Sequence, residues 1–227
     1  MNMIDLSNPY EAQRLADQQG IPVSALYKAD VQHKSQLIEK TPDNPRLYLE
    51  RGNDYYELQD YEAAIKDYLK AQELVPDNPK VYHYLGDCYE HLGLKEKAIE
   101  YLTKALEFQK YEQLDSVYEH RAIIYFEMED FQKALSDINK AIELRPEGIS
   151  EYYKYRSLIL YGLKDYDNAN KDFEHYRTCR IDAMKIVLEN SSYRDKEQVL
   201  VNLFASLTNN DQNQLLAELL VDHDPNI

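Results

Sequence analysis

The amino-acid sequence predicts an all-α protein built from repeated helical hairpins. The tetrapeptide Pro-Asp-Asn-Pro occurs at residues 42–45 and again at residues 76–79, which is a period of 34 residues. A period of roughly 20–50 residues is typical of repeat proteins, in which each unit is one small supersecondary element. Only six Gly and eight Pro occur among the 227 residues, which is few for an all-β protein with its many turns.

Four consecutive units align with one another in this period. Their fourth, eighth, eleventh, twentieth and twenty-fourth places recur, and in the first unit these places hold Tyr48, Gly52, Tyr55, Ala64 and Tyr68. The first three places lie on one face of a helix and the last two on one face of a second helix. The small residues at the eighth and twentieth places would let the two antiparallel helices approach closely.

The expected elements follow in order from this alignment. Residues 1–44 are predicted to form a helical cap or a degenerate repeat, because Asp30 and Lys34 stand where small or apolar residues are expected. The predicted repeats cover 45–78, 79–112, 115–148 and 150–183. The last one is degenerate, because Tyr176 replaces a small residue at the twenty-seventh place.

Two departures from the period affect helix lengths. Lys110 replaces the Pro that ends other units, and Gln113 and Leu114 are extra, so the second helix of the second unit is expected to run longer. After residue 180 a continued or kinked helix is expected to end at Asn190. Amphipathic helices within 184–227 are then predicted to cap the array, since a terminal repeat exposes an apolar flank.

The recurrent residues resemble the tetratricopeptide repeat, whose signature places a large aromatic residue, Leu-Gly, Tyr, Ala, Phe and Pro at these offsets. The resemblance covers residues 45 to about 180. It implies a right-handed α–α superhelix with N- and C-terminal capping helices, and a concave groove that binds a segment of another protein. Another kind of helical hairpin repeat is the alternative.

The resemblance also implies which places on the first helix of each unit face the groove. The predicted peptide-binding residues are Arg46, Leu49, Asn53, Tyr56, Lys80, His83, Tyr84, Asp87, His120, Ile123, Phe126, Lys154, Tyr155 and Leu158. They combine aromatic and aliphatic side chains with charged ones, and aromatic side chains are favoured as anchors in binding interfaces.

A chaperone-tail site is not expected in this groove. Co-chaperones of the family bind a C-terminal carboxylate through a Lys and Asn of one unit, an Asn of the next and basic residues of a third. Only Asn53 matches that pattern, because Leu49 stands at the lysine place and Tyr84 at the second asparagine place. Ser116 and His120 stand where the basic pair is expected, so we predict no carboxylate clamp.

No catalytic motif occurs in the chain. P-loop, GxGxxG, HExxH and GxSxG patterns are absent from the sequence, so we predict a non-enzymatic protein without cofactor or metal. His83 and His120 could face each other across neighbouring first helices, with Asp87 one turn from His83. Because a metal site needs three or four ligands with orienting partners, groove histidines are the favoured interpretation. A metal-binding or enzymatic protein that uses these residues is the alternative.

Charge and cysteine content limit the partners. The chain has 26 Lys and Arg against 41 Asp and Glu, a net charge of −15. Nucleic acid is therefore not expected as a partner, since its binding depends on neutralising phosphates. The expected partner is a neutral or basic protein segment with apolar anchor residues. Two distant cysteines, the absence of a signal peptide pattern and the absence of an apolar run of about 20 residues predict a cytoplasmic protein that does not bind membranes.

We therefore expect a scaffold or adaptor that binds a peptide segment of a partner protein. A chaperone-like holder of a secreted or aggregation-prone client is the alternative function. The C-terminal helices could also form a homodimer or occupy the groove instead of capping the array.

Overall fold

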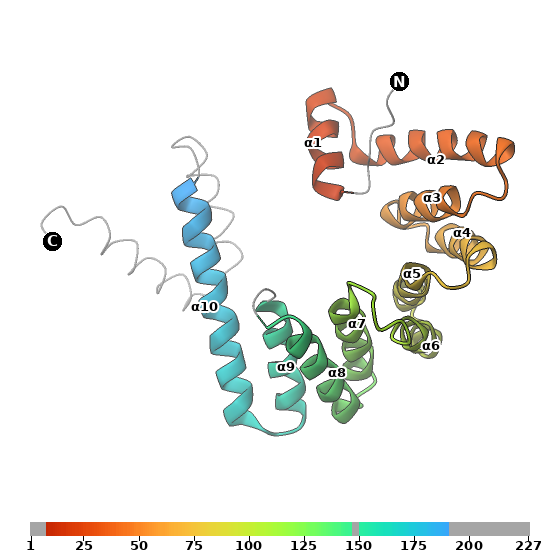
Figure 1. The fold of residues 1–227 in the computed structure, drawn as a ribbon. Helices are drawn as coiled ribbons and strands as arrows, with labels where there is room; N and C mark the ends of the chain where they lie inside the picture. Colours follow the sequence, from red (N-terminus) through yellow and green to blue (C-terminus); the bar gives the residue numbers. More distant parts are fainter. Residues whose placement is uncertain (1–7, 147–149, 191–227) are drawn as a thin grey trace, which may run out of the picture. The chain divides into compact units, whose positions relative to one another are not determined.

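A computed structural model describes residues 8–146 and 150–190. This part of the chain contains ten α-helices and no strand (Figure 1), which confirms the predicted all-α fold. It divides into two compact units, one that ends at Met128 and one that begins at Glu129. None of the helices in the described ranges is both long and apolar enough to cross a membrane.

Helices that are neighbours in sequence pack against one another within each unit. The first unit contains α1 (Pro9–Gln19), α2 (Val23–Lys40), α3 (Pro45–Glu57), α4 (Tyr61–Leu74), α5 (Pro79–His91), α6 (Lys95–Ala105) and α7 (Leu114–Glu127). The second contains α8 (Phe131–Leu144), α9 (Ser150–Gly162) and α10 (Tyr166–Asn190). In the first unit α3 pairs with α4 and α5 with α6, and the first of these hairpins packs on the second through α4 and α5.

The repeated Asn-Pro pair starts helices. The side chains of Asn8, Asn44 and Asn78 each accept a hydrogen bond from the backbone N–H two residues later, and Pro occupies the first helical position. An Asn cap satisfies an N–H that the helix leaves unpaired, and Pro has no N–H to lose there. The second helices α4 and α8 are capped instead by the carboxylates of Asp60 and Asp130.

The small residues of the hairpins are in close contact, as the spacing predicts. A Cβ atom on Gly52 would lie 2.5 Å from Cε1 of Tyr68, and one on Gly86 would lie 2.6 Å from Cγ of Leu102. Ala64 has no exposed surface. The two helices of each hairpin therefore approach at a distance that a larger residue would not allow.

An arginine on the first helix of a hairpin connects three helices. Arg51 of α3 makes two parallel hydrogen bonds to Asp67 of α4, from Nε to Oδ2 and from Nη2 to Oδ1, both at 2.7 Å. Its Nη1 donates to Oγ of Ser35 on the preceding α2 at 2.9 Å. We call this arrangement the arginine tie. A guanidinium suits it because its donors form a rigid planar fork.

The arginine tie occurs again in the second unit. Arg156 of α9 donates to both carboxylate oxygens of Asp172 on α10 at 2.6 and 2.8 Å, and to Asn139 of α8 at 3.0 Å. In the second repeat the same places hold Leu85 and Tyr101, so this repeat replaces the ion pair by apolar residues.

A buried lysine joins the N-terminal helices to the first repeat. Lys34 of α2, which is 7% exposed, lies 2.6 Å from Oδ2 of Asp54 and 2.8 Å from Oδ2 of Asp30, and it donates to the carbonyl of Glu50. The two residues that break the apolar pattern of this segment thus form one ionic contact with α3. Burial raises the pKa of the Asp54 carboxyl from 3.8 to about 6, because one lysine does not offset the desolvation of the carboxylate and its acidic neighbours.

Two expectations on helix length have different outcomes. The second helix of the second repeat does not run longer: α6 ends at Ala105, and residues 106–113 form a connection to α7. Tyr111 of this connection is buried, and its hydroxyl contacts His83 of α5. The last helix, α10, is continuous to Asn190, which agrees with the expected continued helix. Capping helices are predicted within 184–227. Residues 191–227 of that range lie outside the described part of the chain.

The arginine tie can be tested by copying one repeat into another. Arg51→Leu leaves the buried carboxylate of Asp67 without its partner, so we expect the free energy of unfolding to fall by about 3–5 kcal/mol. Adding Asp67→Tyr reproduces the Leu85 and Tyr101 pair and should restore most of that loss. Urea unfolding measures both. The exposed Arg46→Leu serves as a control that should change stability by less than about 1 kcal/mol. A double variant as unstable as Arg51→Leu would contradict the interpretation.

The buried Asp54 predicts a pH-dependent stability. Its folded-state pKa of about 6 exceeds the ordinary 3.8, so the folded protein binds this proton more tightly than the unfolded chain. The stability contributed is complete below about pH 4 and is lost as the pH rises through about 6. Between about pH 4 and pH 7 we expect the wild type to lose about 2–3 kcal/mol of unfolding free energy through this group, and Asp54→Asn to lack this loss. Urea unfolding at a series of pH values measures it, with the exposed Asp77→Asn as control; identical profiles of the two variants would refute the assignment.

Candidate functional site

The predicted groove residues differ in exposure. Arg46, Lys80 and Leu158 are exposed, and His83 and Asp87 are buried. The half-buried residues are Leu49, Asn53, Tyr56, Tyr84, His120, Ile123, Phe126, Lys154, Tyr155. Those of the first unit lie on α3, α5 and α7, whereas Lys154, Tyr155 and Leu158 lie on α9 of the second. Their role in binding a peptide stays a prediction.

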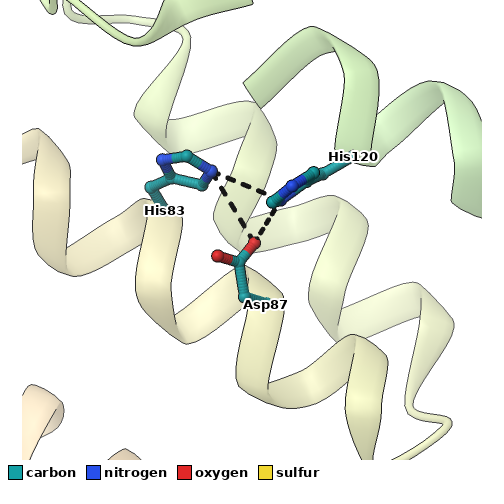
Figure 2. A group of neighbouring side chains, drawn as sticks. All are labelled: His83, Asp87 and His120. Atoms are coloured by element: carbon teal, nitrogen blue, oxygen red, sulfur yellow. Dashed lines mark hydrogen bonds and ion pairs between the residues drawn. The ribbon is translucent and has the colours of Figure 1, made fainter. Parts of the chain in front are cut away.

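Three of these residues meet between α5 and α7. Figure 2 shows the imidazoles of His83 and His120 and the carboxylate of Asp87 directed toward one another. Nε2 of His83 lies 3.3 Å from Nδ1 of His120 and 3.7 Å from Oδ1 of Asp87. Nδ1 of His120 lies 2.5 Å from the same Oδ1. The juxtaposition anticipated from sequence is therefore present, and we call these residues the histidine–aspartate cluster.

A tyrosine that the sequence did not single out orients this cluster. The hydroxyl of Tyr111 donates to Oε1 of Gln113 at 2.7 Å and lies 3.0 Å from Nδ1 of His83. A hydroxyl has one hydrogen, so the oxygen of Tyr111 accepts from the N–H of His83. His83 thus carries its proton on Nδ1, and the lone pair of Nε2 points into the cluster. The only sequence signal near this contact was the departure from the period, in which Gln113 and Leu114 are extra.

Burial and charge act in opposite directions on the two histidines. Burial lowers the pKa of His83 below its ordinary value. For His120 burial also acts downward, but the charge and hydrogen bond of Asp87 and the charge of Glu90 outweigh it and raise the pKa to about 9. His120 is therefore held as an imidazolium beside a carboxylate. Burial raises the pKa of the neighbouring Cys88 thiol to about 12, which fits a packing residue and not a nucleophile.

Two predicted groove residues are used inside the fold. Asn53 accepts a hydrogen bond from the hydroxyl of Tyr68 at 2.9 Å. The hydroxyl of Tyr56 is hydrogen-bonded to Nε2 of His91 at 2.9 Å, and the His91 ring stacks on Tyr61 with centroids 4.6 Å apart. Tyr84 differs from both, because its hydroxyl has no hydrogen-bond partner in the described ranges.

An open pocket of about 680 Å³ lies beside the cluster, where the connection 107–113 meets the start of α5. Its lining includes Lys80, Phe108 and Lys110, together with the orienting Tyr111. Sequence reasoning did not predict this pocket, because it treated the extra residues as helix.

Comparison with known proteins gives two family matches. The family described as regulator of microtubule dynamics protein 1-3 matches residues 58–129. The family described as tetratricopeptide repeat matches residues 115–147. No curated protein matches the chain.

Several solved structures share the fold. A crystal structure of MamA has a TM-score of 0.65 at 20% identity, over 75% of this chain and 95% of that one. PilF of Pseudomonas aeruginosa has a TM-score of 0.62 at 14% identity, over 92% and 98%. The first TPR of Spaghetti (RPAP3), bound to the HSP90 peptide SRMEEVD, has a TM-score of 0.50 at 22% identity, over 53% and 93%.

Proposed function

Because this chain is a tetratricopeptide repeat protein, we propose that it is a non-enzymatic scaffold or adaptor that binds a peptide segment of a partner protein. The binding surface is the face of α3, α5 and α7 that the packing of the hairpins leaves accessible. Two free cysteines, one of them buried, support a reducing cytoplasmic location.

Tyr84 is the observation that carries this proposal. Its ring is half-buried and rests on two inner side chains, with centroids 5.5 Å from Tyr68 and 6.0 Å from His83. A ring supported in this way loses little conformational freedom when a ligand covers it. Its hydroxyl, which lacks a partner in the described residues, remains available to a backbone amide or carbonyl of a bound segment.

Neighbouring helices supply further apolar contacts on the same face. Leu49 of α3 and Ile123 of α7 are each half-buried, so both retain surface that a ligand side chain can cover. The helices α3 and α5 also carry acidic residues, among them Glu50, Glu57 and Glu90. The net charge of −15 acts in the same direction. We infer a partner segment that is neutral or basic and that carries apolar anchor residues.

A peptide selection tests the surface. Random peptides displayed on phage are selected against the protein, and the affinity of the best binder is measured by fluorescence anisotropy. We expect basic, apolar sequences, and an affinity that falls about 30-fold in Tyr84→Ala, as for an interface hot spot. Tyr84→Phe, which loses only the hydroxyl, should fall less.

Leu69→Ala is the matched control for this measurement. Leu69 is an apolar residue on α4 with 37% of its surface exposed, outside the proposed binding face. Its substitution should leave the affinity unchanged. If Tyr84→Ala and Leu69→Ala bind the peptide equally well, while circular dichroism shows both folded, the face of α3, α5 and α7 is not the binding surface.

The acidic peptide SRMEEVD gives a second, independent outcome. In the RPAP3 structure this HSP90 peptide is bound to a fold like that of our chain. Here Asn53 already accepts from Tyr68, and Leu49 and Ser116 offer no cation at places where the clamp has basic residues. The imidazolium of His120, at the remaining basic place, is paired with Asp87. We expect no saturable binding of SRMEEVD in an anisotropy titration. A micromolar affinity that is lost in Asn53→Ala would overturn the predicted absence of a carboxylate clamp.

A further inference from the structure

The histidine–aspartate cluster lies among the predicted groove residues and brings two imidazoles and a carboxylate together. We propose that His83, Asp87 and His120 bind a divalent transition-metal ion, with Zn²⁺ as the ion that fits best. The ligand atoms are Nε2 of His83, Oδ1 of Asp87 and Nδ1 of His120, which all lie within 4.8 Å of one another.

The separations of these atoms suit a tetrahedral ion. Zn–N and Zn–O bonds of about 2.0–2.1 Å at tetrahedral angles place neighbouring ligand atoms about 3.3 Å apart. The three observed separations are 3.3, 3.7 and 2.5 Å. The shortest belongs to the hydrogen bond between His120 and Asp87. Replacing its proton by an ion requires these two side chains to separate by less than about 1 Å.

The cluster also has the orienting partner that a metal site requires. Ligating histidines donate their second N–H to an acceptor that fixes the tautomer and the direction of the ring. The hydroxyl of Tyr111 is that acceptor for Nδ1 of His83, and Gln113 in turn accepts from Tyr111. On binding, Nδ1 of His120 releases its proton to solvent and keeps the proton on Nε2, so an ion takes the place of one proton.

The type of donor determines the type of ion. Two imidazole nitrogens and one carboxylate oxygen suit Zn²⁺ and other first-row transition metals, whereas Mg²⁺ and Ca²⁺ prefer oxygen ligands. The side chain of His120 is 30% exposed, so the cluster is open on one side. Three protein ligands with one open side leave the fourth position to a water molecule.

The untagged 227-residue chain is dialysed against Zn²⁺, and the bound metal is measured by mass spectrometry. The affinity is measured by competition against a chromogenic chelator. We expect one high-affinity ion per chain and no competition from Mg²⁺. His120→Asn should weaken Zn²⁺ binding by more than about 100-fold, and Tyr111→Phe, which removes only the orienting hydroxyl, by about 10-fold. His33→Asn, an exposed histidine of α2, should bind as the wild type does.

Substitution by Co²⁺ gives a readout that needs no variant. A tetrahedral site with nitrogen and oxygen donors gives intense visible absorption bands, whereas Co²⁺ on surface carboxylates remains octahedral and almost colourless. A wild-type protein that binds no Zn²⁺ at micromolar concentration, or binds Co²⁺ without these bands, would refute the site. Equal Zn²⁺ affinity in folded His120→Asn and His33→Asn would do the same. These outcomes test the metal site alone, and the Tyr84 variants test peptide binding with no metal added.

Discussion

The packing of the repeats depends on how each first helix is fixed to the helices on either side of it. Arg51 and Arg156 do this with a planar guanidinium, which binds the carboxylate of its own hairpin with two donors and the preceding hairpin with a third. Desolvating an ion pair is costly, and apolar residues often replace it without loss. The second repeat uses that substitution, with Leu85 and Tyr101 at the same places. The ion pair and its Leu–Tyr replacement occur in hairpins of the same kind. The spacing of the two helices is therefore the constraint, and the side chains that maintain it differ between repeats.

Once this packing is satisfied, the remaining face of each first helix is free for other purposes. In α5 that face carries His83, Tyr84 and Asp87, and α7 presents His120 to it. The connection 106–113 then adds Tyr111, which gives His83 a defined tautomer. The longest departure from the repeat period therefore lies beside the histidine–aspartate cluster. In the first repeat the places of Lys110 and Tyr111 hold Pro76 and Asp77.

The sequence could predict what depends on spacing within one hairpin. The close approach at Gly52, the buried Ala64 and the meeting of His83, Asp87 and His120 all follow from helical periodicity and the 34-residue period. It could not predict contacts that depend on the path of a connection, such as that of Tyr111, because the extra residues were compatible with a longer helix. It also treated Asp30 and Lys34 as defects. They are instead a buried ionic contact, which hydrophobic patterning does not detect because it scores each residue without its partner.

The peptide surface and the histidine–aspartate cluster are adjacent, so the two proposals have a common physical consequence. The Tyr84 ring stacks at 27° on the imidazole of His83, and His83 is a proposed ligand. An ion that joins His83 and Asp87 of α5 to His120 of α7 would restrict the separation of these helices. Because binding to the folded state alone stabilises it, the ion would favour the conformation in which Tyr84 is supported. A peptide that covers Tyr84 would then lose less entropy on binding, since the surface it requires is already ordered. Coupling of this kind is reciprocal, so the peptide would also raise the affinity for the ion.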